Sequence, residues 1–103
     1  YNAGSIMIQH SVIFKLKHAK GSKAEKRFME AVMRLASIPG VLNFKRFRQT
    51  SKKNTFDYGL VMEFESTMEY EAYNQHSEHQ GFIRDYWMDG VDDFLEIDYE
   101  PLS

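Results

Sequence analysis

Alternating apolar and polar residues mark the two clearest strands that this chain predicts. From 7 to 17, apolar side chains occupy every second position as far as Leu16, and His10 shares their face. The same period of two returns from 55 to 65, where it is most regular. A period of two with one apolar face is typical of a half-buried strand. The pattern therefore predicts strands over 7–17 and 55–65, with His10 on the apolar face of the first.

Two other stretches have helical spacing, and each begins with a capping box. Ser22 and Glu25 form the first box, and apolar residues at intervals of three or four predict an amphipathic helix over 23–37. Pro39-Gly40 ends it. Ser66 and Glu69 form the second box and open a helix that runs to about residue 75. The residues expected near one face of this second helix are Met68, Ala72, Tyr73 and His76.

The second helix is expected to break over 77–80, because serine is a poor residue for a helix interior and the apolar periodicity stops there. A short helical piece over 81–88 follows, and Asp89-Gly90 is a turn signal.

Weaker alternation predicts two more strands, over 41–49 and 94–100. The five polar residues 50–54 are short enough to join the strands on either side as an antiparallel hairpin. The resulting order is strand, helix, strand, strand, helix, strand, which is the ferredoxin-like α+β fold with a four-stranded antiparallel sheet. Both helices then cover one face of the sheet. The open face needs a partner, and a second copy of the chain predicts a homodimer.

The composition excludes several classes of function but does not identify one. The 103 residues fit one domain over 7–103, and residues 1–6 are expected to be a tail or a remnant of expression. A net charge of −2 gives no field that would attract nucleic acid, and no apolar run is long enough to span a membrane. There are no cysteines, so disulfides and thiolate chemistry are excluded. Without a signal-peptide pattern, a cytoplasmic location is expected.

Candidate chemistry gathers between residues 70 and 82. His76 and His79 lie three residues apart, and Tyr73 lies three residues before the first of them. Aromatic rings and imidazoles at a helix end are a plausible wall for a pocket. His10 is either a hydrogen-bonded core residue or a base on the inner wall of the sheet.

Six segments, in order along the chain, resemble the stress-responsive A/B barrel (Dabb) family. They are 9–17, 38–41, 64–66, Tyr73, His76 with 79–82, and 98–101. The resemblance covers about residues 7–102 and implies a dimeric α/β barrel in which two sheets pack together. Many members of this family have no assigned function, and some are linked to stress tolerance.

One distantly similar protein, the plant olivetolic acid cyclase, implies where a site would lie. Its pocket histidine and tyrosine on the second helix fall at His79 and Tyr73, and its first-strand histidine falls at His10. A further pocket histidine of that enzyme falls at Tyr58, where this chain departs from it.

Two function classes remain open. In the first, the protein binds a small molecule in a pocket of a homodimer without catalysis. In the second, it is a cyclase, lyase or isomerase in which His79 is the acid or base, Tyr73 donates a hydrogen bond to the developing oxyanion and His10 orients them. The ligand-binding residues expected in either class are His76, Tyr58 and Phe82. The enzyme class requires Tyr58 to share one cavity with the three catalytic candidates.

No cofactor and no metal are predicted. A zinc site of His76 and His79 with His10 and Glu78 is the alternative, but a helix break between the two histidines makes a common orientation uncertain. A cation held by carbonyls around 35–41 and a haem bound through His79 or His76 are two further alternatives. No phosphate-binding loop and no nucleophile elbow occur in the chain.

Overall fold

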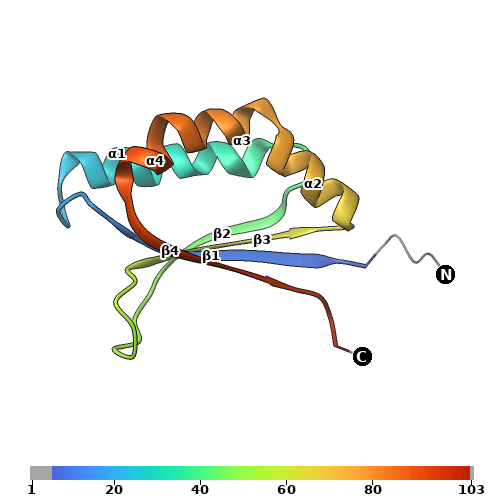
Figure 1. Ribbon diagram of the computed structural model, residues 1–103, viewed down its shortest axis with the longest axis horizontal. Coiled ribbons are helices and arrows are strands. Elements are labelled where there is room, and N and C mark those ends of the chain that lie inside the picture. Colours follow the sequence, from blue (N-terminus) through green and yellow to red (C-terminus); the bar gives the residue numbers. More distant parts are fainter. Residues whose placement is uncertain (1–5, 103) are drawn as a thin grey trace.

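The computed structural model describes residues 6–102 as a layer of helices on one face of a four-stranded antiparallel sheet (Figure 1). The strands are β1 (Ile8–Leu16), β2 (Leu42–Arg48), β3 (Tyr58–Phe64) and β4 (Val91–Tyr99), in the order β2-β3-β1-β4. The helices are α1 (Lys23–Ala31), η2 (Val32–Ser37), α2 (Thr67–Gln75), α3 (Ser77–Phe82), η3 (Ile83–Trp87) and α4 (Met88–Gly90). This arrangement confirms the predicted ferredoxin-like α+β fold.

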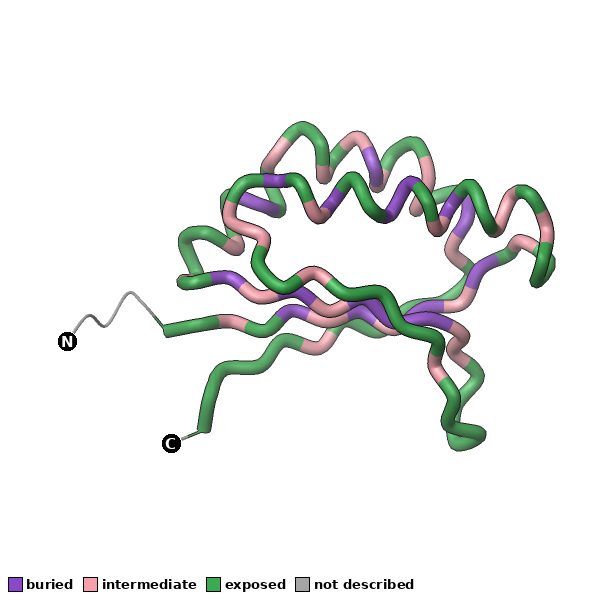
Figure 2. The backbone as a smooth tube through the Cα atoms, turned by 180° about the vertical axis from the view of Figure 1, so that it is seen from behind, coloured by how far each residue is buried: buried purple, intermediate pink, exposed green. Residues whose placement is uncertain are grey.

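The core lies between the helices and the two central strands (Figure 2). Alternate residues of β1 and β3 point into it, and Phe14 and Phe64 are fully buried. The Phe14 ring lies 5.8 Å from that of Phe28 in α1 and 5.2 Å from that of Trp87 in η3. Burial of apolar surface in such a cluster is the main force that holds helices to a sheet. The alternating pattern in the sequence therefore correctly predicts which side chains of these two strands are buried.

The opposite face of the sheet carries a group of apolar side chains and no helix (Figure 1). The strand register places Ile13 of β1 beside Leu95 of β4 on this face. On its other side Ile13 pairs with Gly59 of β3, and Val61, two residues further along β3, lies on the same face. Leu95 and Phe47 are about half exposed there. An apolar sheet face of this kind matches the open face that the sequence predicts.

Both predicted capping boxes form. The Ser22 side chain accepts a hydrogen bond from the Glu25 backbone N–H, and Ser66 does the same for Glu69. The first predicted helix covers α1 and η2 together, with its last turns tightened into a 3-10 helix. Gly40, with a φ of +92°, then turns the chain toward β2, a conformation that glycine adopts without strain.

The expected helix break at 77–80 is wrong. The break is a single residue, His76, whose φ of −65° and ψ of 139° are extended. The His76 Nδ1 accepts a hydrogen bond of 3.1 Å from the Glu78 N–H, so the imidazole caps the start of α3. The helix over 77–82 starts directly after His76, because a side chain outside the usual set of caps satisfies one of its free N–H groups.

Two further expectations around this helix are wrong. Met68 does not share the helix face of the buried Tyr73, because it is 79% exposed. Asp89-Gly90 is not a turn, since α4 runs to Gly90 and β4 begins at Val91, three residues earlier than predicted. A Cβ at Gly90 would lie 3.0 Å from the Phe28 ring, so the absence of a side chain lets the helix end meet α1. The predicted tail at 1–6 lies outside the described residues except for Ile6.

We predict that Phe14→Ala lowers the free energy of unfolding by about 3–5 kcal/mol, because it leaves a cavity among the rings of the core. Chemical denaturation followed by circular dichroism measures this change. The control is Met68→Ala at an exposed position, which we expect to change stability by less than about 0.5 kcal/mol. Equal effects of the two substitutions would contradict the assignment of the core.

Candidate functional site

A cavity of about 230 Å³ lies between the sheet and the second helical segment. Its walls are mostly apolar, and four polar side chains reach it: His10, Tyr73, His79 and Glu96. The apolar lining residues come from β1, β3, η2, α3, η3 and β4: Val12, Leu35, Leu60, Met62, Phe82, Ile83, Trp87 and Phe94. A concave apolar site with a few convergent polar groups is the usual form of a small-molecule site.

His10 is held in one orientation by a carboxylate on the neighbouring strand. Antiparallel register places Asp98 of β4 directly beside His10 of β1, and the His10 Nδ1 lies 2.6 Å from the Asp98 Oδ1. The Tyr70 hydroxyl of α2 donates to the other oxygen, Oδ2, at 2.9 Å. A carboxylate on Nδ1 favours the tautomer with the proton there, which leaves the Nε2 lone pair free. His10 is only 5% exposed, so its remaining contacts are within the protein.

His79 is oriented in the same way, from the helical side. Its Nδ1 lies 3.2 Å from the Asn74 carbonyl oxygen, so Nδ1–H donates and Nε2 is left as an acceptor. Burial lowers the pKa of His79 from its ordinary value, and the neighbouring His10 lowers it further. The imidazole is therefore neutral at pH 7 and able to accept a proton.

Tyr73 lies between the two imidazoles. Its ring centroid is 4.6 Å from that of His79 and 6.4 Å from that of His10. The side chain is buried, and its hydroxyl makes no hydrogen bond to any residue in the range 6–102. Burial raises the pKa of Tyr73, and the charge of Glu96 raises it further, so the hydroxyl remains a donor.

These three groups together offer acid–base chemistry in a low-dielectric space. Two Nε2 atoms accept hydrogen bonds, and one phenol either donates or accepts. A neutral histidine close to a polarised carbonyl is suited to removing a neighbouring proton.

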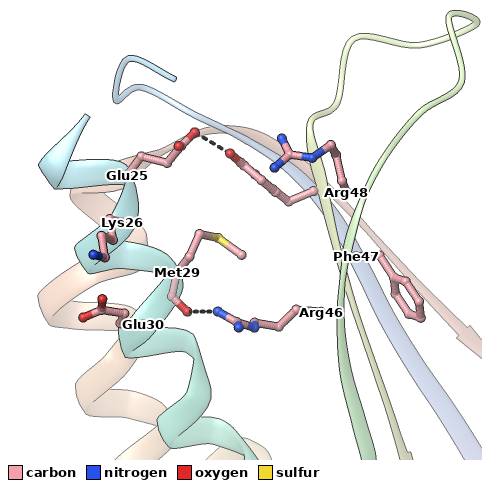
Figure 3. Close-up of a pocket in the computed structure, with 8 residues that line it drawn as sticks. Glu25, Lys26, Met29, Glu30, Arg46, Phe47 and Arg48 are labelled. Carbon is pink, nitrogen blue, oxygen red and sulfur yellow. Dashed lines mark hydrogen bonds between the residues drawn. The ribbon is translucent and has the colours of Figure 1, made fainter. Parts of the chain in front are cut away.

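Four of the six sequence-predicted site residues meet in this cavity: His10, Tyr73, His79 and Phe82. Their catalytic and binding roles stay predictions. Tyr58 does not join them, so the condition that the sequence analysis set for the enzyme class is not met. It lines a separate open groove of about 500 Å³ between α1 and β2 (Figure 3).

In that groove the Tyr58 hydroxyl donates to the Glu25 carboxylate, and burial together with this hydrogen bond raises the pKa of Tyr58 to about 12. Arg46 crosses the groove to donate to the Met29 carbonyl oxygen at 2.7 Å (Figure 3). Tyr58 points the same way as the other core residues of β3, but it lies at the end of the strand beneath α1. Its distance along the strand separates it from the histidines.

His76 is also elsewhere. It caps α3 and lines a shallow hollow of about 220 Å³ with Pro39, Arg34 and Glu78. The backbone break at His76 turns this imidazole away from His79, although the two are three residues apart. A shared ligand of both histidines is therefore not supported by the geometry.

Sequence reasoning missed four residues of the site: Asp98, Tyr70, Glu96 and Trp87. The two carboxylates alternate with apolar residues on a predicted strand, which is also the pattern of a solvated edge. Only the register between β1 and β4 reveals that Asp98 lies beside His10 and Glu96 beside Val12. Trp87 lines the cavity from η3.

Within the described range 6–102, no three histidine, cysteine, aspartate or glutamate side chains gather closely enough to hold a metal ion. In the same range, no helix is both long enough and apolar enough to cross a membrane.

Comparison with known proteins gives both a family and a near relative. The model of the stress responsive A/B barrel domain, Dabb, matches residues 8–101. A Dabb family protein with a ferredoxin-like fold from Mesorhizobium loti is 46% identical and has a TM-score of 0.92, covering 95% of this chain and 99% of that one. Among curated proteins, none matches this chain.

More distant solved structures share the architecture. A dimeric ferredoxin-like protein of unknown function from a Jannaschia species is 25% identical, with a TM-score of 0.72, and covers 92% of this chain and 99% of that one. Hydroxynitrile lyase from Passiflora edulis is 12% identical, with a TM-score of 0.82 and 96% of each chain covered, a likeness that shows the fold alone. The match over residues 8–101 and the 46% identity to a member show that this chain belongs to the stress responsive A/B barrel domain (Dabb) family.

Proposed function

We propose that this protein binds a small, largely apolar molecule in the cavity that His10, Tyr73 and His79 line. The observation that carries the proposal is the meeting of three oriented polar rings with an apolar wall in one space of about 230 Å³. An apolar cavity of about 150 Å³ in another protein accommodates benzene. The present cavity therefore fits one ring with a short polar substituent.

A second candidate function is proton transfer on the bound molecule, as in a lyase, isomerase or cyclase. It would have to proceed with His10, Tyr73 and His79 alone, because Tyr58, which the sequence analysis required for the enzyme class, lies outside the cavity. The Asp98–His10 hydrogen bond favours it, because a carboxylate that fixes an imidazole tautomer is a frequent feature of acid–base sites. The neutral state of His79 supports it as well.

The step would run as follows for a carbonyl compound. The His79 Nε2 takes a proton from the carbon next to the carbonyl, and the C–H electron pair moves to form the enolate. The Tyr73 hydroxyl donates a hydrogen bond to the enolate oxygen, and His79 returns the proton to carbon. The step is balanced without an oxidant or a reductant.

We further propose that the protein acts as a homodimer. The apolar sheet face bears half-exposed Leu95, Phe47 and Tyr99, and no described segment covers it. The relative from Jannaschia is dimeric with the same fold. Packing two such faces together would remove this surface from water and join two cavities into one assembly.

The binding proposal is tested by a matched pair of histidine variants. We expect His79→Asn to weaken binding of benzyl alcohol about tenfold, because the hydrogen bond from the ligand hydroxyl to the His79 Nε2 is lost. His76→Asn should leave affinity unchanged, since asparagine still caps α3 and His76 lies outside the cavity. Fluorescence of Trp87, the one tryptophan of the chain and a lining residue, reports binding. Equal affinities in both variants would refute the site.

Proton transfer is tested by exchange of a ketone's α-hydrogens with solvent deuterium, followed by NMR. The base must be neutral, and burial places the pKa of His79 below its ordinary 6.5. We therefore expect the exchange rate to be level above pH 6.5 and to fall as the pH drops below that value. His79→Asn should lower the rate roughly a hundredfold. If the α-hydrogens of a bound ketone exchange no faster than in buffer, the proton-transfer proposal is refuted and the binding proposal remains.

The dimer is tested by sedimentation at micromolar concentration. We expect a species of twice the chain mass of 12.1 kDa, and a monomer for Leu95→Glu, which places a charge on the apolar sheet face. Met88→Glu, at a 69% exposed position on the helical side, is the control and should stay dimeric. A wild-type monomer would contradict the proposal.

A further inference from the structure

We infer that the cavity selects an uncharged or cationic ligand that bears a hydroxyl or amino group, and that Glu96 is the residue that excludes carboxylates. This inference rests on the proposed binding function and specifies the class of its ligand. It depends on three observations: the charges around the cavity, the direction of the free hydrogen-bonding atoms, and the position of Glu96 at the opening.

The charges around the cavity are negative. Among the described residues that line it there is no lysine and no arginine, whereas Glu96 contributes a carboxylate. A second carboxylate, Asp98, lies directly behind His10. Within residues 6–102, Glu96 forms no ion pair, so its charge is not offset by a neighbouring cation. An anionic ligand would meet repulsion here without a compensating contact.

The free polar atoms are mainly acceptors. Both imidazoles have their Nδ1–H engaged, His10 by Asp98 and His79 by the Asn74 carbonyl. Each therefore presents an Nε2 lone pair, whereas the donors among the lining side chains are the Tyr73 hydroxyl and the Trp87 indole N–H. A carboxylate ligand offers acceptors alone and would leave both lone pairs unpaired in a buried space. A ligand with O–H or N–H groups satisfies them.

Glu96 lies on the exposed side of the cavity. The buried lining residues of β1 and β3 close the floor, but Phe94 and Glu96 of β4 are exposed, so the cavity opens along β4. The Phe94 ring meets that of Trp87 edge to face at 5.5 Å and forms one side of the opening. Glu96 follows two residues later on the same side of the strand, beside Val12.

The same carboxylate also affects the groups inside. Its charge contributes to the raised pKa of Tyr73, which keeps that hydroxyl protonated. The Glu96 charge attracts a cationic ligand and has little effect on a neutral alcohol. Glu96 thus discriminates by charge and not by shape.

Three probes that share one ring separate these effects: benzyl alcohol, benzylamine and benzoate at pH 7.5. Their binding to the full chain is followed by Trp87 fluorescence and by the NMR shifts of His10 and His79. We expect the alcohol and the amine to bind, and benzoate to bind about tenfold more weakly than the alcohol.

The variant Glu96→Gln keeps the size of the side chain and removes its charge. It should tighten benzoate about fivefold, the typical effect of one exposed charge, weaken benzylamine by a similar factor and leave benzyl alcohol within about twofold. The control is Glu65→Gln, an exposed carboxylate that does not line the cavity and should change none of the three affinities.

The possible outcomes distinguish a failure of the charge selection from a failure of the proposed binding function. Equal binding of all three probes would overturn the charge selection but leave the binding function intact. Exclusion of benzoate that persists unchanged in Glu96→Gln would overturn the role of Glu96. Failure of every probe to move the signals of Trp87, His10 and His79 would overturn the binding function, and the inference with it.

Discussion

The central position of β1, paired on both sides, is the constraint on which the site depends. Pairing with β3 brings Met62 beside His10, and pairing with β4 brings Asp98 to its other side. A strand flanked on both edges has its backbone hydrogen bonds satisfied within the sheet, so its side chains are held in fixed directions. The histidine is therefore oriented by residues far from it in sequence. The helices complete the cavity, but the sheet register determines which polar groups face one another.

The sequence was informative about which residues are buried, because a local pattern reports burial. It was uninformative about which residues lie side by side, because that depends on the register between neighbouring strands. The period of two correctly predicted that His10 lies on the buried face of its strand, whereas the helical spacing grouped the buried Tyr73 with the exposed Met68. Tyr58 has the same alternating pattern as its neighbours, yet it lies beneath α1, because the position along a strand is not encoded in the alternation. Asp98 could not be distinguished from a solvated carboxylate without knowing which strand lies next to β4.

The helical half of the site shows a different limit of prediction. An imidazole is not among the usual helix caps, so nothing in the sequence indicated that His76 would start a new helix. The continuation through η3 includes a π-helical turn, a rare conformation often found at functional sites. This turn carries Ile83 and Trp87, and both line the cavity. The wider π-helical turn of η3 therefore places these two side chains in the cavity wall at positions that differ from those of an ordinary α-helix.

The pairing of His10 with Asp98 joins residues 88 positions apart, and this affects the order in which the domain is made. Synthesis produces β1 first and β4 last, and β4 is the strand that holds the carboxylate. Until β4 is present, one edge of the central strand remains open and His10 lacks its partner. A nascent chain that already contains both long helices would still have an incomplete site and a strand edge able to pair with another chain. The final strand therefore closes the open edge of β1 at the same time as it completes the cavity.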